Sequence, residues 1–318
     1  MAMSESARKS YEKAFRAKKK KKRSHWLFIQ KGDGLKEILS KLFTQLCVLV
    51  LIGCGVILGR EAYLSISAQK LNSSLKDLYD SVVGGVDSLT GHEIMPGAKE
   101  LLALNPETVG YIKIDGTEVD FPVVQAADND RYLTTSFDGS YNKAGTVFLD
   151  YRCVLTDKKR SDNLVVYGHN QRDRTMFGSL KDYKNNLEHY KAHPTITFNS
   201  NYRSDTYKIF AYFVTEVEPR QTADGYIFDY HNYIDLSDDA RYERFISDIR
   251  ERSQIITGVD VKQSDEFLTL STCSNEFEPS RFVIFARKVR KGESADVDTS
   301  AASLNPDART FDWSYVNR

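Results

Sequence analysis

The sequence predicts an all-β fold, a barrel of about eight strands that follows N-terminal helices and contains one inserted helix. Short apolar runs begin at Gly110, and several of them alternate apolar and polar residues. Gly, Asn, Asp and Pro separate these runs, as expected for turns between strands. The expected strands are Tyr111–Ile114, Val119–Val124, Thr146–Leu149, Leu164–Tyr167, Thr195–Phe198, Tyr207–Val217, Phe267–Ser271 and Phe282–Val289.

Helical periodicity occurs before the strands and once between them. Apolar residues at about helical spacing predict helices over 64–84 and 96–104, within a helical linker of residues 60–109. The barrel is expected to occupy residues 110–291. An amphipathic helix is expected within it over 237–252, because four apolar residues there follow the i, i+3, i+4, i+7 pattern: Tyr242, Phe245, Ile246 and Ile249.

The N-terminal region predicts a membrane anchor. Residues 1–37 carry twelve Lys/Arg and four Asp/Glu, whereas the rest of the chain carries 32 and 40. Residues 42–59 contain no charge, and a transmembrane helix needs about 20 mostly apolar residues. We expect a basic cytoplasmic segment over 1–41, an uncleaved single span over 42–59 and the remainder outside, because cations mark the cytoplasmic side. A nucleic-acid-binding arm and a cleaved signal peptide are the competing interpretations.

The remaining composition is that of a globular protein. Of 318 residues, 41% are apolar and 28% are charged, so a sizeable core is possible. Residues 292–318 are polar and rich in Ser, Asp and Ala, which predicts a flexible C-terminal tail. Three aromatic residues in this tail are nevertheless available to dock on the domain: Phe311, Trp313 and Tyr315.

The four cysteines divide into two pairs. Cys47 and Cys54 lie inside the apolar window and are most simply small apolar residues. Cys153 and Cys273 lie outside it, where they could form one disulfide or comprise one reactive thiol and one bystander. The sequence has no CxxC spacing and no recognisable nucleotide or haem motif, so we expect neither a metal nor a cofactor.

Cys273 stands at the end of an expected strand, in FLTLSTCSNEF. Alternation along the strand places Thr269, Ser271 and Cys273 on one face. A thiol at a strand end faces a loop mouth that a substrate can reach. A buried, inert cysteine is the alternative, and the local sequence alone does not separate the two.

Arg281 opens the next expected strand, after a connection of seven residues. If the two strands form an antiparallel hairpin, Arg281 lies opposite Cys273 or close to it, with Cβ atoms roughly 5 Å apart. A guanidinium there can favour a thiolate and donate hydrogen bonds to an oxyanion. A solvated surface Arg at a strand start is the alternative.

His169 follows another apolar strand, in Val-Val-Tyr-Gly-His-Asn. The preceding glycine permits a sharp turn, and a Cys/His pair on neighbouring strand ends is a recurring arrangement for acyl transfer. The chain has six histidines in total, and His193 is the strongest rival. We interpret His193 as a structural loop residue.

Two blocks of sequence resemble the signature blocks of the sortases. They are NLVVYGHN, and TLSTC with Arg281 eight residues after the cysteine. The stretch VGYIKIDGTEVDFPVVQAADNDRYLTTSFDG, with AGTVFLDYR after it, is similar to class B sortases in particular, and the resemblance covers about residues 71–290. It implies a sortase-type eight-stranded β-barrel.

The resemblance also implies roles for individual residues. Cys273 corresponds to the nucleophile that attacks the Thr carbonyl of a sorting signal, His169 to the general acid/base, and Arg281 to the oxyanion-stabilising residue. Residues beside these are expected to contact the substrate: Thr272, Ser271 and Asn170. Some class B members are proposed to use an acid shortly after the cysteine, but Ser274 and Asn275 stand there, so we assign no third acidic member.

The implied reaction is transpeptidation at the outer face of a Gram-positive cell membrane. Its expected partners are surface proteins bearing a C-terminal signal of the NPxTx or LPxTG kind, an amine of a peptidoglycan precursor or a pilin, and membrane lipid. A pilin-polymerising sortase is the alternative enzyme, and a membrane-anchored binding protein with a buried Cys273 is the alternative outside catalysis.

Overall fold

The computed structural model describes residues 9–10, 27–83, 93–274 and 276–316. The chain divides into two compact units, Met1–Leu64 and Ser65–Arg318. Helix α2 (Leu35–Val83) is 49 residues long, and its most apolar part has a mean hydropathy of 2.4 with none of it buried. Within the described residues it is the one helix long and apolar enough to cross a membrane. The apolar window and the helix expected over 64–84 therefore belong to one continuous helix.

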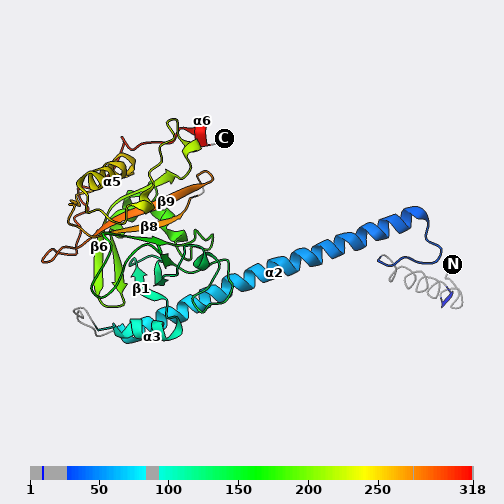
Figure 1. The fold of residues 1–318 in the computed structure, drawn as a ribbon. Helices are drawn as coiled ribbons and strands as arrows, with labels where there is room; N and C mark the ends of the chain where they lie inside the picture. The colour runs from blue at the N-terminus through cyan, green and yellow to red at the C-terminus, as the bar shows by residue number, and fades with distance from the viewer. Residues whose placement is uncertain (1–8, 11–26, 84–92, 275, 317–318) are drawn as a thin grey trace, which may run out of the picture. The chain divides into compact units, whose positions relative to one another are not determined.

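The barrel prediction is confirmed. Eight strands close in the order β1-β2-β3-β4-β8-β9-β6-β5, and β10 pairs with β7 in a separate two-stranded sheet. Figure 1 labels β1, β6, β8 and β9 of the barrel. Each of the eight expected runs forms one barrel strand. The strands are β1 (Thr108–Lys113), β2 (Asp120–Val124), β3 (Phe148–Leu149), β4 (Asn163–Tyr167), β5 (Thr195–Ser200), β6 (Ser204–Glu216), β7 (Ile255–Ile256), β8 (Phe267–Cys273), β9 (Ser280–Lys288) and β10 (Ser303–Leu304).

Helices occupy the connections. The amphipathic pattern over 237–252 forms α5, which begins after the cap of Asp238, whose side chain accepts a hydrogen bond from the Arg241 amide. Shorter helical pieces that the sequence did not predict also occur. The helices after α2 are α3 (Pro96–Leu104), η1 (Arg131–Leu133), η2 (Gly178–Tyr183), α4 (Leu187–Ala192), η3 (Pro219–Gln221), η4 (Tyr230–Asn232), α5 (Asp239–Arg252) and α6 (Trp313–Val316).

Three apolar clusters hold the second unit together. The barrel interior is filled by side chains such as Ile112, Leu270 and Ile284. A second cluster joins α5 to the outer face of β6, β8 and β9. Within it the Phe245 and Phe285 rings meet edge to face with centroids 5.8 Å apart. A third packs α2 and α3 on β1. The first two clusters bury apolar side chains on both faces of β8 and β9. A one-residue slip would turn each of these side chains to the opposite face, so the packing fixes the register of the two strands.

Two pairings place the strand ends that matter for chemistry. Strands β4 and β8 are parallel, with Tyr167 opposite Ser271, so both end at the same edge of the barrel. Strands β8 and β9 are antiparallel, and Cys273 pairs with Arg281. The barrel therefore brings the ends of β4 and β8 and the start of β9 to one rim.

The C-terminal segment was expected to be a flexible tail over 292–318. Its described part, up to residue 316, includes β10, which pairs with β7, and α6. Val316 is buried and belongs to the barrel core cluster, and Phe311 packs against the same cluster. Part of this segment thus docks on the domain.

Candidate active site

Cys273 is the last residue of β8 and is exposed, whereas the residues before it are buried. Leu268 and Leu270 point into the barrel core and hold the strand in place. The cysteine is free, as are the three others. Cys153 is buried, and this burial raises the pKa of its thiol to about 12. The two cysteines outside the apolar window therefore differ in accessibility.

Arg281 lies opposite Cys273 in the β8–β9 register, as the hairpin prediction requires. Its side chain is half-buried, and one N–H donates to the Ser280 carbonyl at 3.1 Å. A guanidinium has five N–H donors, so this bond uses only part of its capacity. Arg281 can present donors to an oxygen that approaches the Cys273 sulfur.

His169 follows β4 after a turn that requires glycine. The amide of Gly168 donates to the Ser271 carbonyl at 3.2 Å, and a Cβ on Gly168 would lie 2.7 Å from the Phe177 ring. The His169 Nε2 lies 2.7 Å from the Leu133 carbonyl oxygen. Because a carbonyl only accepts, Nε2 carries the proton in this bond and Nδ1 is the nitrogen left for other chemistry.

The loop after His169 is tied to the cysteine strand. The side-chain amide of Asn170 donates to the Cys273 carbonyl at 2.9 Å, and the Phe177 amide donates to the His169 carbonyl at 3.0 Å. Arg174 and Met176 adopt φ values of 71° and 53°, which side chains other than glycine rarely adopt. These contacts fix the position of the histidine relative to the cysteine.

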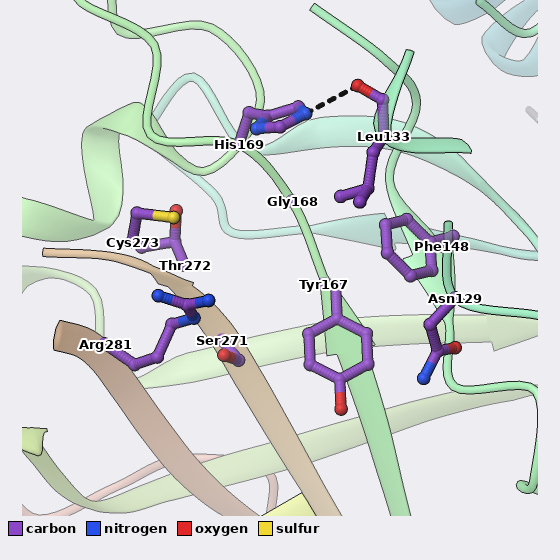
Figure 2. A pocket seen from close by; sticks show the side chains of 10 residues that line it. All are labelled: Asn129, Leu133, Phe148, Tyr167, Gly168, His169, Ser271, Thr272, Cys273 and Arg281. Atoms are coloured by element: carbon purple, nitrogen blue, oxygen red, sulfur yellow. Dashed lines mark hydrogen bonds between the residues drawn. The ribbon is translucent and has the colours of Figure 1, made fainter. Parts of the chain in front are cut away.

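The three residues meet in one cavity of about 200 Å³ (Figure 2). Figure 2 shows the Cys273 sulfur, the Arg281 guanidinium and the His169 ring around the same opening. Ser271 and Thr272 line this cavity as well, whereas Asn170 does not line it and instead bonds the cysteine backbone. The other lining residues are Asn129, Leu133, Phe148, Tyr167 and Gly168.

A buried carboxylate holds two residues of the cavity wall. Asp150 is fully buried, and its side chain accepts from the Tyr167 hydroxyl at 2.9 Å and from the Asn129 amide at 3.0 Å. Arg152 donates to it through Nε at 2.9 Å and Nη2 at 2.8 Å. Burial acts to raise the pKa of the Asp150 carboxyl, but the bonds from Arg152, Tyr167 and Asn129 together hold that pKa below its usual range.

Three residues that line the cavity were not predicted from the sequence: Asn129, Leu133 and Tyr167. Asn129 and Leu133 lie in a segment without periodicity, and Tyr167 was visible only as a strand residue. His193, the rival histidine, has the contacts of a structural loop residue. Its Nδ1 lies 2.7 Å from the Asp115 carbonyl oxygen, and its ring occupies the space that a Cβ on Gly116 would need. Among the described residues no group of His, Cys, Asp and Glu has metal-binding geometry.

Comparison with known proteins decides the family. The family model described as Sortase domain matches residues 112–289, more than half of the chain. The chain belongs to the sortase family. Sortase B of Listeria monocytogenes is 30% identical over 261 residues, which cover 81% of this chain and 99% of the relative. This sortase is accordingly a sortase B homologue and a cysteine transpeptidase.

Solved structures agree with this placement. The Staphylococcus aureus sortase B–substrate complex matches with a TM-score of 0.61 and 27% identity, over 71% of this chain and 98% of that one. A sortase B complexed with triglycine matches with a TM-score of 0.61 and 26% identity, over 71% and 99%. The fold similarity of this sortase thus extends over nearly the whole of each neighbour.

Proposed function

We propose that this sortase cleaves a C-terminal sorting signal at its Thr carbonyl through a thioester on Cys273, and transfers the protein to a cell-wall amine. The observation that carries the proposal is the convergence of Cys273, His169 and Arg281 on one cavity at the barrel rim. A thiol nucleophile, a proton carrier and an oxyanion donor are the groups that acyl transfer requires.

In the first half-reaction Cys273 gives its thiol proton to Nδ1 of His169, and the resulting thiolate attacks the Thr carbonyl carbon, so that the electron pair moves to the carbonyl oxygen. Arg281 stabilises that oxyanion from across the hairpin. The C–N bond then breaks, and His169 gives its proton to the leaving amine. In the second half-reaction His169 takes a proton from the acceptor amine, which attacks the thioester and releases the thiolate.

The geometry of His169 suits this role. Its Nε2–H donates to the Leu133 carbonyl, which holds the ring in one orientation, and Nδ1 lies on the side away from Leu133 (Figure 2). A fixed ring with one free nitrogen can carry a proton between the sulfur, the leaving amine and the acceptor amine. Asn170 supports the same geometry by bonding the Cys273 carbonyl.

Thr272 and Ser271 are proposed to shape the substrate site. The Thr272 hydroxyl is buried and has no hydrogen-bond partner among the described residues, although buried polar groups are normally paired. A peptide bound in the cavity would supply a hydrogen-bond partner for the Thr272 hydroxyl. The Ser271 hydroxyl is held by Tyr230 at 2.7 Å. The neighbouring structures are described as complexes with a substrate and with triglycine, which favours an extended peptide and a glycine-type amine as partners here.

The signal is proposed to be of the NPxTx kind, because this sortase is a sortase B homologue, with an LPxTG signal as the second candidate. The amine acceptor is a peptidoglycan precursor or, in a pilin-polymerising enzyme, a pilin lysine. We test these by incubating the full chain in detergent micelles with NPxTx and LPxTG peptides and triglycine. Transfer of either peptide by wild type, and none by Cys273→Ala, is expected. Equal transfer by Cys273→Ala would refute the assignment.

The anchor is proposed to be uncleaved, with residues 1–41 in the cytoplasm, the span at 42–59, a helical linker over 60–109 and the catalytic barrel over 110–291 outside. The apolar part of α2 and the Lys/Arg excess before it support this orientation. In sealed right-side-out cells, an external protease should digest the barrel and spare the N-terminal segment. Protection of the barrel would contradict the orientation.

A further inference from the structure

The C-terminal segment extends beyond the family match, which ends at residue 289. It returns to the domain and bonds the end of α5. The backbone amide of Asn305 donates to the Gln254 carbonyl at 2.9 Å, and its side-chain amide donates to the Ser253 carbonyl at 2.9 Å. The Arg309 amide donates to the Glu251 carbonyl at 2.8 Å. These bonds fix the path of the chain toward its last aromatic residues.

Beyond these bonds the segment packs on the loop that follows the cysteine. The rings of Phe277 and Phe311 meet edge to face, with centroids 4.8 Å apart and planes at 72°. Trp313 approaches Phe277 at 6.3 Å and Phe311 at 6.1 Å, also edge to face. Aromatic pairs in this arrangement are mutually attractive beyond their apolar burial. Phe277 is only 6% exposed although it lies in a loop, and it also belongs to the barrel core cluster.

Phe277 sits midway along the connection between the two proposed active-site residues of the hairpin. It follows Cys273 by four residues and precedes Arg281 by four. The Ser280 hydroxyl donates to the Phe277 carbonyl at 2.6 Å, and the Ser274 amide donates to the Ser280 carbonyl at 3.0 Å. Phe277 is therefore bonded to the first residue of β9, and that residue in turn bonds the residue that follows Cys273.

Two other contacts hold the same loop from the domain side. The Gln221 side chain donates to the Pro279 carbonyl at 2.7 Å, and Lys184 forms an ion pair with Glu276. Both of these partners are polar, and the Lys184–Glu276 pair is partly exposed, so it contributes little. The aromatic contact with the C-terminal segment adds an apolar restraint to the packing of Phe277 in the barrel core cluster.

We propose that Phe311 and Trp313 are positioning residues for the transpeptidation: by clamping Phe277 they restrain the loop that joins Cys273 to Arg281, two residues that the β8–β9 register pairs. This inference rests on the proposed roles of Cys273 and Arg281. Without the clamp the loop gains conformations, and the sulfur and the guanidinium less often occupy the geometry that the oxyanion needs. A misplacement of about 1 Å at a reacting group can lower a rate about 100-fold.

The test compares four variants of the full chain in detergent micelles. Trp313→Ala and Phe311→Ala remove the clamp, and Trp313→Phe conserves it. Leu304→Ala is the matched control, because Leu304 is a half-exposed apolar residue of the same segment that pairs with β7 rather than with the loop. Trp313 is 51% exposed, so its replacement should leave the fold intact, which far-UV circular dichroism checks.

Two readouts separate positioning from folding. For Phe311→Ala we expect kcat for peptide transfer to triglycine to fall about tenfold with KM changed less than about twofold, since geometry rather than binding is lost. Trp313→Ala should show a smaller fall of the same kind, Trp313→Phe should recover most of it, and Leu304→Ala should match wild type. Hydrogen exchange at 276–280 should speed up in the two clamp variants alone.

The proposal is overturned if Phe311→Ala and Trp313→Ala keep both the wild-type kcat and the wild-type exchange at 276–280, or if Leu304→Ala lowers kcat equally. Failure of the proposed function is a different outcome: wild type then transfers no peptide. In that case exchange at 276–280 and the alkylation rate of Cys273 still report whether the clamp fixes the loop.

Discussion

Replacing Asp150 by Asn should lower both the stability and the peptide-transfer rate of this sortase. The substitution keeps the shape of the side chain and removes its charge. It leaves Arg152 without its carboxylate, because the NH₂ group that replaces Oδ1 cannot accept from Arg152 Nε. Tyr167 and Asn129, which both donate to Oδ2, then bond a neutral amide oxygen, which is a weaker acceptor than a carboxylate.

The magnitude follows from the burial of the two partners. Removing one partner of a fully buried ion pair costs about 3–5 kcal/mol. The Asp150 side chain is fully buried but that of Arg152 is 31% exposed, so water can solvate part of the released charge. We therefore expect the free energy of unfolding to fall by about 2–3 kcal/mol, below the value for a fully buried pair.

The loss should depend on pH in a defined direction. Because the folded-state pKa of Asp150 lies below its usual range, its contribution is present above the unfolded pKa of about 4 and disappears as the pH falls through the folded pKa. The free energies of unfolding of wild type and Asp150→Asn should thus differ most near pH 7 and become equal in acid. Denaturant unfolding followed by near-UV circular dichroism at pH 7 and at low pH measures both values.

Asp130→Asn is the matched control, because Asp130 is an exposed carboxylate near the same wall, and its stability should stay within about 0.5 kcal/mol of wild type. A difference between Asp150→Asn and wild type that is under about 1 kcal/mol, or one that is unchanged in acid, would show that the charge of Asp150 does not stabilise the cavity wall.

Further predictions concern the thiols and the turn before His169. Iodoacetamide at pH 7 should alkylate Cys273 much faster than Cys153, because Cys153 is buried and its thiol pKa is raised to about 12. Mass spectrometry of protein digests measures both alkylation rates. Equal labelling of the two cysteines would contradict this prediction. Gly168→Ala should lower kcat for transfer at least about tenfold, since its Cβ would lie 2.7 Å from the Phe177 ring and the histidine turn must move. Gly258→Ala, whose Cβ would meet nothing within 4 Å, should keep wild-type kcat, and parallel losses in both would point to a general effect.

The barrel could be predicted because its strands bear local signals. Each of the eight strands appeared as a short apolar run between turn residues, several of them with alternation, and the i, i+3, i+4, i+7 pattern marked α5. The two-residue strands β7 and β10 escaped prediction, since two residues contain no period. The aromatic residues of the C-terminal segment were visible as candidates for docking, but the sequence did not indicate where they dock, because their partner Phe277 lies in a distant loop.

The candidate site likewise contains residues that the sequence indicated and residues that it did not. Cys273, His169 and Arg281 were candidates from the sequence because each is a reactive or charged residue at one end of an apolar strand, and the resemblance to the sortases singled them out. Asn129 and Leu133 were not visible, because only the closed barrel brings residues 129–133 against the end of β4. Their places depend on the order of strands around the barrel, which no local pattern encodes.

The central claim is that Cys273 forms the acyl-enzyme. It is tested most directly by mixing the full chain with a sorting-signal peptide, omitting the amine acceptor, quenching in acid and locating the adduct by mass spectrometry. The account predicts one adduct, the peptide up to its Thr, on the fragment that contains Cys273, and its loss when triglycine is added. An adduct on another residue, or release of the peptide at the wild-type rate by Cys273→Ala, would contradict it.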